Sequence, residues 1–231
     1  MKWRWICIYF LTATIVVTAC LWGSRVVNVL SESHPIHRDH CVVIDAGHGG
    51  IDGGAISCTG RSESTYNLDI SLRLNDLFRL LGYDTRMIRT TDTSVHISGD
   101  SIAQKKSSDL KQRVHLVNET EAAVLISIHQ NFFSDSQYSG AQVFYGSREG
   151  SQILAETIQQ TFLETVNTGS HREIKKGSGI YLLEHVKSPA VLVECGFLSN
   201  LEEEAKLRNP NYQKRLCCVI ASATSSFLSN T

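Results

Sequence analysis

The segment Cys41-Val42-Val43-Ile44-Asp45-Ala46-Gly47-His48 runs directly into the glycine-rich segment Gly49-Gly50-Ile51-Asp52-Gly53-Gly54. Its first four residues are apolar and mostly β-branched, which predicts a short buried strand. The glycines that follow permit positive φ angles and close approach of the backbone to a ligand. His48 stands at the exit of this strand, between two carboxylates. Open α/β sheets bind ligands where their strands end, so the alternatives are a binding site and a glycine-rich turn with an incidental imidazole.

Two further apolar runs also end in side chains that bind metals. Residues 122–128 are followed by His129, and residues 189–193 are followed by Glu194. Three predicted strands that each deliver such a side chain at the carboxyl end are much harder to obtain by chance than one. A catalytic zinc site commonly takes three protein ligands from histidine and glutamate, with water in the fourth position. The sequence therefore favours a metal centre at this edge of a sheet.

The composition of the 231-residue chain is that of one globular domain, long enough to bury a core without disulfides or structural metals. The formal net charge is −1, so the chain lacks the basic footprint of a nucleic-acid-binding protein. We therefore expect no nucleic-acid partner.

The N-terminus has the pattern of a membrane anchor or an export signal. Lys2 and Arg4 precede an uncharged apolar run from Trp5 to Trp22, which approaches the length needed to cross a bilayer. The positive flank predicts that the remainder of the chain is exported. We expect residues 1–23 to be the anchor or signal segment, 24–40 a linker and 41–231 the catalytic domain.

Two features of these N-terminal residues have alternative interpretations. The preferred interpretation of the apolar run is an uncleaved anchor. The second is a cleaved or lipidated signal, with Cys20 as the lipidated residue, because residues 17–20 resemble a bacterial lipoprotein cleavage site. The linker carries His34, His37 and His40, but Pro35 interrupts any helix that would align them. A solvated linker is favoured over a metal site there.

The rest of the chain alternates helical and strand patterns. Apolar residues recur at helical spacing between Ile70 and Leu81, after a polar helix start at residues 62–65. Residues 93–108 are polar and aperiodic, which predicts a long surface loop. This alternation predicts an α/β fold with a mostly parallel sheet covered by helices on both faces. Further helices are expected from Asp109, after Asn200 and from Pro210, and further strands at 83–89, 140–145 and 180–183, the last paired with 190–193.

Two charged residues on the predicted helices carry alternative interpretations. Glu63 lies in the first turn of its helix, where the helix dipole favours a carboxylate. It is also close enough in the chain to reach His48 as a metal ligand, and spacing alone leaves both alternatives open. Arg113 lies beside the apolar face of the helix expected from Asp109. It is either a substrate contact or part of a buried ion pair, and the ion pair is the default.

Several blocks of the sequence match the conserved motifs of one known protein family. These blocks are Val43 to Gly50, Glu63, Arg89 to Asp92, Asp109 to Val114, Ser127 to Asn131, and Val193 to Asn200. Together they resemble the zinc-dependent N-acetylmuramoyl-L-alanine amidases of bacterial cell walls. The resemblance covers residues 41–228, and its most specific part is Gly196-Phe197-Leu198-Ser199-Asn200. Within the family, the chain looks most like the spore-cortex amidases of endospore-forming bacteria, which also have an N-terminal apolar segment and one catalytic domain.

The resemblance implies a role for each matched side chain. The two histidines and the glutamate that hold the metal in the family match His48, Glu63 and His129. The catalytic glutamate of the family matches Glu194. Ala46 stands where family members often have proline, a change that touches no ligand.

The same resemblance implies the cofactor and the reaction. The cofactor is Zn²⁺, and the reaction is hydrolysis of the amide that joins the lactyl group of N-acetylmuramic acid to L-alanine. Glu194 would accept a proton from water and pass it to the leaving amine. Either Asp45 or Asp52 would orient His48.

Substrate contacts and partners are also implied. Asn131 and Arg113 are candidate substrate-binding residues, and peptidoglycan is the implied substrate. In the spore cortex this cut precedes formation of muramic-δ-lactam, which germination enzymes recognise. An activating lipoprotein is an expected helper, and the expected place of action is outside the cytoplasm at a membrane, including the space between forespore and mother cell. The alternatives are another zinc peptidase and a non-catalytic wall-binding protein on the same scaffold.

Overall fold

The computed structural model describes residues 37–230, so the expected membrane segment and most of the expected linker lie outside the described residues. Within this range no helix combines the length and apolarity needed to cross a bilayer. The elements follow in the order β1 (His37–Ala46), α2 (Glu63–Leu80), β2 (Tyr83–Met87), α3 (Ile102–Asn118), β3 (Ala123–Asn131), β4 (Gln142–Tyr145), α4 (Ser151–Thr165), β5 (Lys175–Lys176), α5 (Tyr181–His185), β6 (Ala190–Phe197), α6 (Leu201–Arg208) and α7 (Pro210–Leu228).

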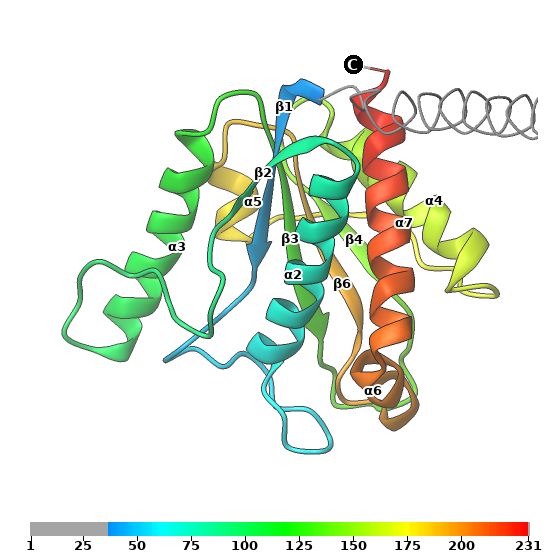
Figure 1. Ribbon diagram of the computed structural model, residues 1–231. Helices are drawn as coiled ribbons and strands as arrows, with labels where there is room; N and C mark the ends of the chain where they lie inside the picture. The colour runs from blue at the N-terminus through cyan, green and yellow to red at the C-terminus, as the bar shows by residue number, and fades with distance from the viewer. Residues whose placement is uncertain (1–36, 231) are drawn as a thin grey trace, which may run out of the picture. The chain divides into compact units, whose positions relative to one another are not determined.

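The strands form one six-stranded sheet in the order β2-β1-β3-β6-β4-β5 (Figure 1). The first four strands of this order are mutually parallel. β4 runs antiparallel to β6, and β5 runs parallel to β4. The expectation of an α/β fold with a mostly parallel sheet is confirmed. β1 begins at His37, inside the segment expected to be linker, and pairs there with Tyr83 across an irregularity in the ladder.

Alternate residues of the central strands enter two separate hydrophobic layers. Val42 and Ile44 belong to the layer beneath α2, α4 and α7, whereas Val43 belongs to the layer beneath α3 and α5. Because successive side chains of a strand point to opposite faces, continuous apolar runs such as these require cover on both sides. Figure 1 shows α3 and α5 on one side of the sheet and α2 and α7 on the other.

One expected boundary is wrong. The sequence placed a surface loop over residues 93–108 and a helix start at Asp109, but α3 begins at Ile102. Ser101 is its N-cap and forms a capping box with Gln104. The first turns of α3 are polar, so no apolar periodicity marked them as helical. Asp109 lies inside the helix, where its carboxylate accepts a hydrogen bond from the Val95 backbone N–H at 2.6 Å.

A second expectation is also wrong. Residues 180–183 do not form a strand beside 190–193, because Tyr181–His185 is the helix α5. The place beside β6 is taken by β4, with Val143 opposite Val193. Leu182 and Leu183 are buried in the layer beneath α3 and α5. A short apolar run has too few residues to show whether its period is that of a helix or a strand, so only its burial could be predicted.

Candidate metal centre and catalytic glutamate

The side chains singled out at strand ends do meet at one edge of the sheet. β1, β3 and β6 are parallel neighbours, so their carboxyl ends lie together. His48 follows β1 by two residues, and His129 and Glu194 lie near the ends of β3 and β6. His129 and Glu194 are register partners, which places their side chains on the same face of the sheet. Adjacent parallel strands thus bring together residues far apart in sequence.

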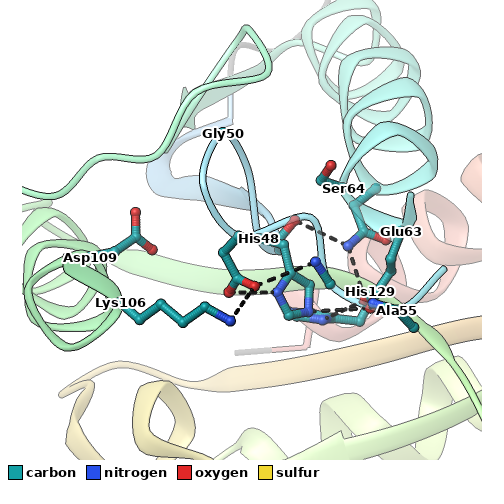
Figure 2. Close-up of polar contacts among 12 residues, drawn as sticks. His48, Gly50, Ala55, Glu63, Ser64, Lys106, Asp109 and His129 are labelled. Carbon is teal, nitrogen blue, oxygen red and sulfur yellow. Dashed lines mark hydrogen bonds and ion pairs between the residues drawn. The ribbon is translucent and has the colours of Figure 1, made fainter. Parts of the chain in front are cut away.

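His48, Glu63 and His129 form a compact cluster of three metal-binding side chains (Figure 2). One ligand atom from each lies within 4.8 Å of the other two. The Nε2 atom of His48 is 3.3 Å from Oε2 of Glu63, and Nδ1 of His129 is 3.0 Å from Oε1. The imidazole rings stand edge to face with their centroids 4.9 Å apart. Two imidazole nitrogens and one carboxylate are the donor set of a catalytic zinc site, so these residues fit that metal.

Glu63 reaches this cluster from the first turn of α2 and is only 4% exposed. Its Oε2 atom accepts a hydrogen bond from the Ala55 backbone N–H at 3.0 Å. Its Oε1 atom accepts from the Asn67 side chain and the Gln130 backbone N–H, both at 3.2 Å. Burial by itself raises the pKa of Glu63, but hydrogen bonds and charge from the two histidines outweigh it and hold the pKa well below its usual range. The carboxylate is therefore ionised and fixed in orientation.

Asp52 is the carboxylate that contacts His48. Its Oδ2 atom lies 2.9 Å from Nδ1 of His48, and its Oδ1 atom accepts a hydrogen bond from Lys106 at 2.7 Å. Burial lowers the pKa of His48, but Glu63 and Asp52 raise it to about 9 in the absence of metal. Asp52 thus directs the Nε2 atom of His48 toward Glu63, the role that the sequence left open between Asp45 and Asp52.

Asp45 instead lies beneath the loop in a buried network. Its carboxylate pairs with Arg113 and accepts a hydrogen bond from the Ser127 hydroxyl at 2.6 Å. Burial raises the pKa of Asp45, but Arg113 and Ser127 outweigh that effect and lower it. Arg113 also pairs with Asp109 at 2.6 Å and is 2% exposed. The structure therefore shows the buried ion pair, and the side chain of Arg113 is not open to a substrate.

Two buried arginines hold the backbone of the glycine-rich loop. Arg113 donates to the carbonyl of His48 at 2.7 Å and to that of Ala46 at 3.0 Å. Arg89 donates to the carbonyls of Ala46 and Gly47 at 2.7 and 3.0 Å. These bonds satisfy carbonyls that the turn leaves outside the sheet. They also stabilise His48 at φ 60°, a conformation that non-glycine residues adopt rarely.

Gly47 and Gly54 leave room for His129 and Glu63, two of the candidate metal ligands. A Cβ atom on Gly47 would lie 2.1 Å from Nε2 of His129. A Cβ atom on Gly54, whose φ is +69°, would lie 2.5 Å from Oε2 of Glu63. Both distances are far shorter than any non-bonded contact, so these positions accept only glycine while the ligands keep their places.

Glu194 stands next to the cluster without a fixed partner of its own. Its Oε2 atom is buried and makes no hydrogen bond within residues 37–230. Burial raises the pKa of Glu194 to about 7, because His129 and His48 lower it less than burial and the charge of Glu63 raise it. A carboxyl group with a pKa near neutrality is suited to accept and return a proton.

Asn131 lies at the end of β3, two residues beyond His129, and lines a small cleft beside the cluster. Its backbone carbonyl accepts a hydrogen bond from the Leu198 backbone N–H at 2.8 Å. Sequence reasoning missed Asn67, Gln130 and Lys106 as supporting residues. The capping pattern at Ser101 was the available signal for Lys106, because it extends α3 back to that residue.

The sheet is mostly parallel, and two histidines and two glutamates lie together at its carboxyl edge. This arrangement defines the class of protein as an α/β enzyme whose candidate active site can bind a metal ion. Residues 42–226 match the family described as N-acetylmuramoyl-L-alanine amidase, and the chain belongs to that family.

Three relatives show how closely the chain follows that family. It is 36% identical over 182 residues to the germination-specific N-acetylmuramoyl-L-alanine amidase of Bacillus subtilis, which covers 78% of this chain and 76% of the relative. The CwlD amidase from Clostridioides difficile, solved in complex with the GerS lipoprotein, has a TM-score of 0.80 at 35% identity over 83% of this chain and 100% of that one. The catalytic domain of CwlV from Bacillus (Paenibacillus) polymyxa has a TM-score of 0.71 at 30% identity over 82% and 98%.

Proposed function

We propose that this protein is a zinc-dependent amidase that cuts the bond between N-acetylmuramic acid and L-alanine in the peptidoglycan of the spore cortex. The observation that carries the proposal is the cluster of His48, Glu63 and His129, with Glu194 in register beside it. The family supports the bond that is cut, and the relative named as germination-specific supports the cortex as the place of action.

His48, Glu63 and His129 would hold the zinc ion. Bound there, zinc supplies a Lewis acid that lowers the pKa of a water molecule and polarises an amide carbonyl. The three side chains offer two neutral ligands and one anionic ligand, which leaves a net positive charge to favour that chemistry. Asp52 keeps Nε2 of His48 turned toward the cluster through the 2.9 Å contact with Nδ1.

Glu194 carries the proton transfers. As the water oxygen bonds to the amide carbonyl carbon, the Glu194 carboxylate accepts a proton from that water. As the C–N bond breaks, the same group gives the proton to the departing nitrogen. The products are the carboxylic acid of the lactyl group and a peptide with a free amine on L-alanine. The raised pKa of Glu194, about 7, suits a group that must both accept and donate near neutral pH.

Arg113 is a positioning residue in this scheme. It holds the carbonyls of Ala46 and His48 and neutralises Asp45, so it acts on the reaction through the placement of His48. Asn131 lines the cleft beside Glu194 and is the candidate substrate contact of the two expected from the sequence.

The proposed setting is the developing spore, outside the cytoplasm. The uncharged run from Trp5 to Trp22, after Lys2 and Arg4, supports attachment to a membrane. The solved complex of a similar amidase with a lipoprotein supports a lipoprotein partner for this chain too. The proposed consequence of the cut is formation of muramic-δ-lactam, the modification required for germination.

The test combines metal analysis with product analysis. Purified full-length protein should contain one zinc per chain, lose it on His48→Ala, Glu63→Ala or His129→Ala, and release L-alanyl peptides from sacculi as measured by mass spectrometry. A deletion strain should make cortex without muramic-δ-lactam. Hydrolysis of ordinary peptides in place of muropeptides would indicate another zinc peptidase. Wall binding without any product would indicate a non-catalytic protein.

A further inference from the structure

A cleft of about 270 Å³ opens at the same edge of the sheet as Glu194, on the side of β4 and β5. Gln142, which lines it, is the register partner of Glu194 across β4 and β6. Asn131 and Phe197, which also line it, pair with each other across β3 and β6 just beyond His129 and Glu194. The cleft therefore begins directly beside the group that carries the proton.

The charged residues that line this cleft are cationic. Arg172 and Lys175 contribute to its wall, and none of the described residues that line it is acidic. Nε of Arg172 donates to the Ser139 carbonyl at 2.7 Å, and Nη1 donates to the Gln142 side chain at 3.0 Å. Among residues 37–230, Nη2 of Arg172 and Nζ of Lys175 make no hydrogen bond or ion pair. The cleft thus presents an oriented guanidinium and an exposed ammonium group to an anion.

Aromatic rings form the remaining wall. The Arg172 guanidinium lies 4.6 Å from the centroid of the Phe197 ring, and Tyr138 stacks against the same ring with the centroids 6.2 Å apart. Phe133 stands edge to face with Tyr138 at 5.0 Å. Phe133 and Tyr138 are 50% and 42% exposed. Exposed rings beside two cations suit a ligand that is partly apolar and negatively charged.

The chemistry of the leaving group indicates which half of the substrate occupies the cleft. Glu194 delivers its proton to the departing nitrogen, and that nitrogen belongs to the peptide. The peptide half must therefore lie on the Glu194 side of the scissile bond, where the cleft begins. Stem peptides of peptidoglycan carry free carboxylates a few bonds beyond L-alanine, within reach of a cleft of this size.

We propose that this cleft binds the peptide half of the substrate and that Lys175, with Arg172, pairs with a carboxylate next to L-alanine. The inference rests on the proposed function, because it takes Glu194 as the proton donor. It makes Lys175 a specificity residue that distinguishes stem peptides with a free carboxylate at the second residue from those in which that carboxyl is amidated.

The chain offers a matched control on the same strand. Lys176 follows Lys175 in β5, is also exposed, and lines a different cavity with Tyr145 and Leu183. Successive residues of a strand point to opposite faces, so Lys175→Ala and Lys176→Ala remove the same charge from the two sides of β5. The two probes are disaccharide tripeptides with glutamate at the second position, one with a free α-carboxyl and one with an α-amide.

With full-length zinc-loaded protein, Lys175→Ala should raise KM for the free-acid probe about five- to tenfold, the size of one charge-assisted contact near a surface, and leave kcat unchanged. The amidated probe should change less than about twofold, and Lys176→Ala should change neither probe. Equal effects of the two variants, or equal losses on the two probes, would overturn the proposal while the amidase assignment stands. If the wild-type protein cleaves neither probe nor sacculi, alone or with extract from sporulating cells that supplies a lipoprotein partner, the proposed function itself fails.

Discussion

The two flanks of the candidate metal centre differ in how their side chains are held. On the β1 flank, Arg89 and Arg113 are buried and donate to consecutive carbonyls of the glycine-rich loop. On the β4 flank, Phe133, Tyr138 and Lys175 are exposed, and the Phe133 and Tyr138 rings contact each other edge to face. The first arrangement fixes His48, a candidate metal ligand, before anything binds, whereas the second leaves side chains available to a substrate.

The difference has an energetic origin. A buried arginine is costly unless its donors are satisfied and its charge is paired, and Arg113 meets both conditions through Asp45, Asp109 and backbone carbonyls. Such a network has one arrangement of low free energy, so it places His48 reproducibly. Exposed side chains lose little by moving, because water replaces their contacts.

The largest effect on activity is expected at Glu194, where the two flanks meet. Glu194→Gln keeps the shape of the side chain but cannot take up a proton at neutral pH, so turnover on muropeptides should fall by roughly 10²- to 10⁴-fold. Zinc content should stay at the wild-type level, because Glu194 is not among the three clustered ligands. Loss of zinc would reassign Glu194 as a ligand, and normal turnover would remove it from the reaction.

The next effect tests how tightly the β1 flank is held. Arg113→Met leaves the Asp45 carboxylate buried without its partner, which should cost about 3–5 kcal/mol in the free energy of unfolding. Lys111→Met, at an exposed position of the same helix, should change it by no more than about 0.5 kcal/mol. Urea unfolding midpoints measure both. The double variant Asp45→Asn with Arg113→Met should recover part of the lost stability. Similar midpoints for Arg113→Met and Lys111→Met would contradict the view that the β1 flank is tightly held.

A smaller effect, on zinc affinity, is expected when a candidate metal ligand is displaced by a neighbouring side chain but is not itself substituted. In Gly47→Ala the new methyl group would overlap the His129 ring, so zinc affinity should fall by about 10- to 100-fold, as for changes that reorient a ligand. The control is Gly53→Ala in the same loop, where the nearest atom is Ser62 Cβ at 3.5 Å. Titration against a competing chelator measures the affinity. Equal affinities in the two variants would mean that the loop moves to accommodate a side chain.

The smallest effect on stability belongs to the β4 flank. Phe133→Ala should change the free energy of unfolding by no more than about 0.5 kcal/mol, because the ring is half exposed. Phe78→Ala, which removes a fully buried ring of α2, should cost about 3–5 kcal/mol. If the two phenylalanines cost the same, the β4 flank is as tightly packed as the core, and the contrast between the flanks disappears.

Much of the site was predictable from local patterns. The apolar runs before His48, His129 and Glu194 predict buried parallel strands, and parallel strands bring their carboxyl ends to one edge. The start of α2 after Ser62 and the start of α7 at Asn209-Pro210 were predicted from helix-start patterns and are confirmed, and Asn209 caps α7 with its side chain, whereas Ser62 makes no side-chain cap hydrogen bond.

Other elements could not be predicted because their signals are weak over short spans. The polar first turns of α3 lack apolar periodicity, and the apolar run of α5 is too short to have one. β4 and β5, the last two strands in the order of the sheet, run antiparallel to the other four, and this direction is set by the pairing of β4 with β6. Pairing depends on residues distant in sequence, which a local pattern does not record.

By itself, the sequence determined which side chains stand at strand ends and that glycines surround His48, because period and backbone freedom are local properties. The tertiary structure alone decided that Asp52 rather than Asp45 contacts His48, and that Arg113 lies beneath the loop instead of facing substrate. It also placed Glu63 between the two histidines, since the docking of α2 on the sheet sets that distance. These are contacts between separate elements, and they exist only once the helices have packed on the sheet.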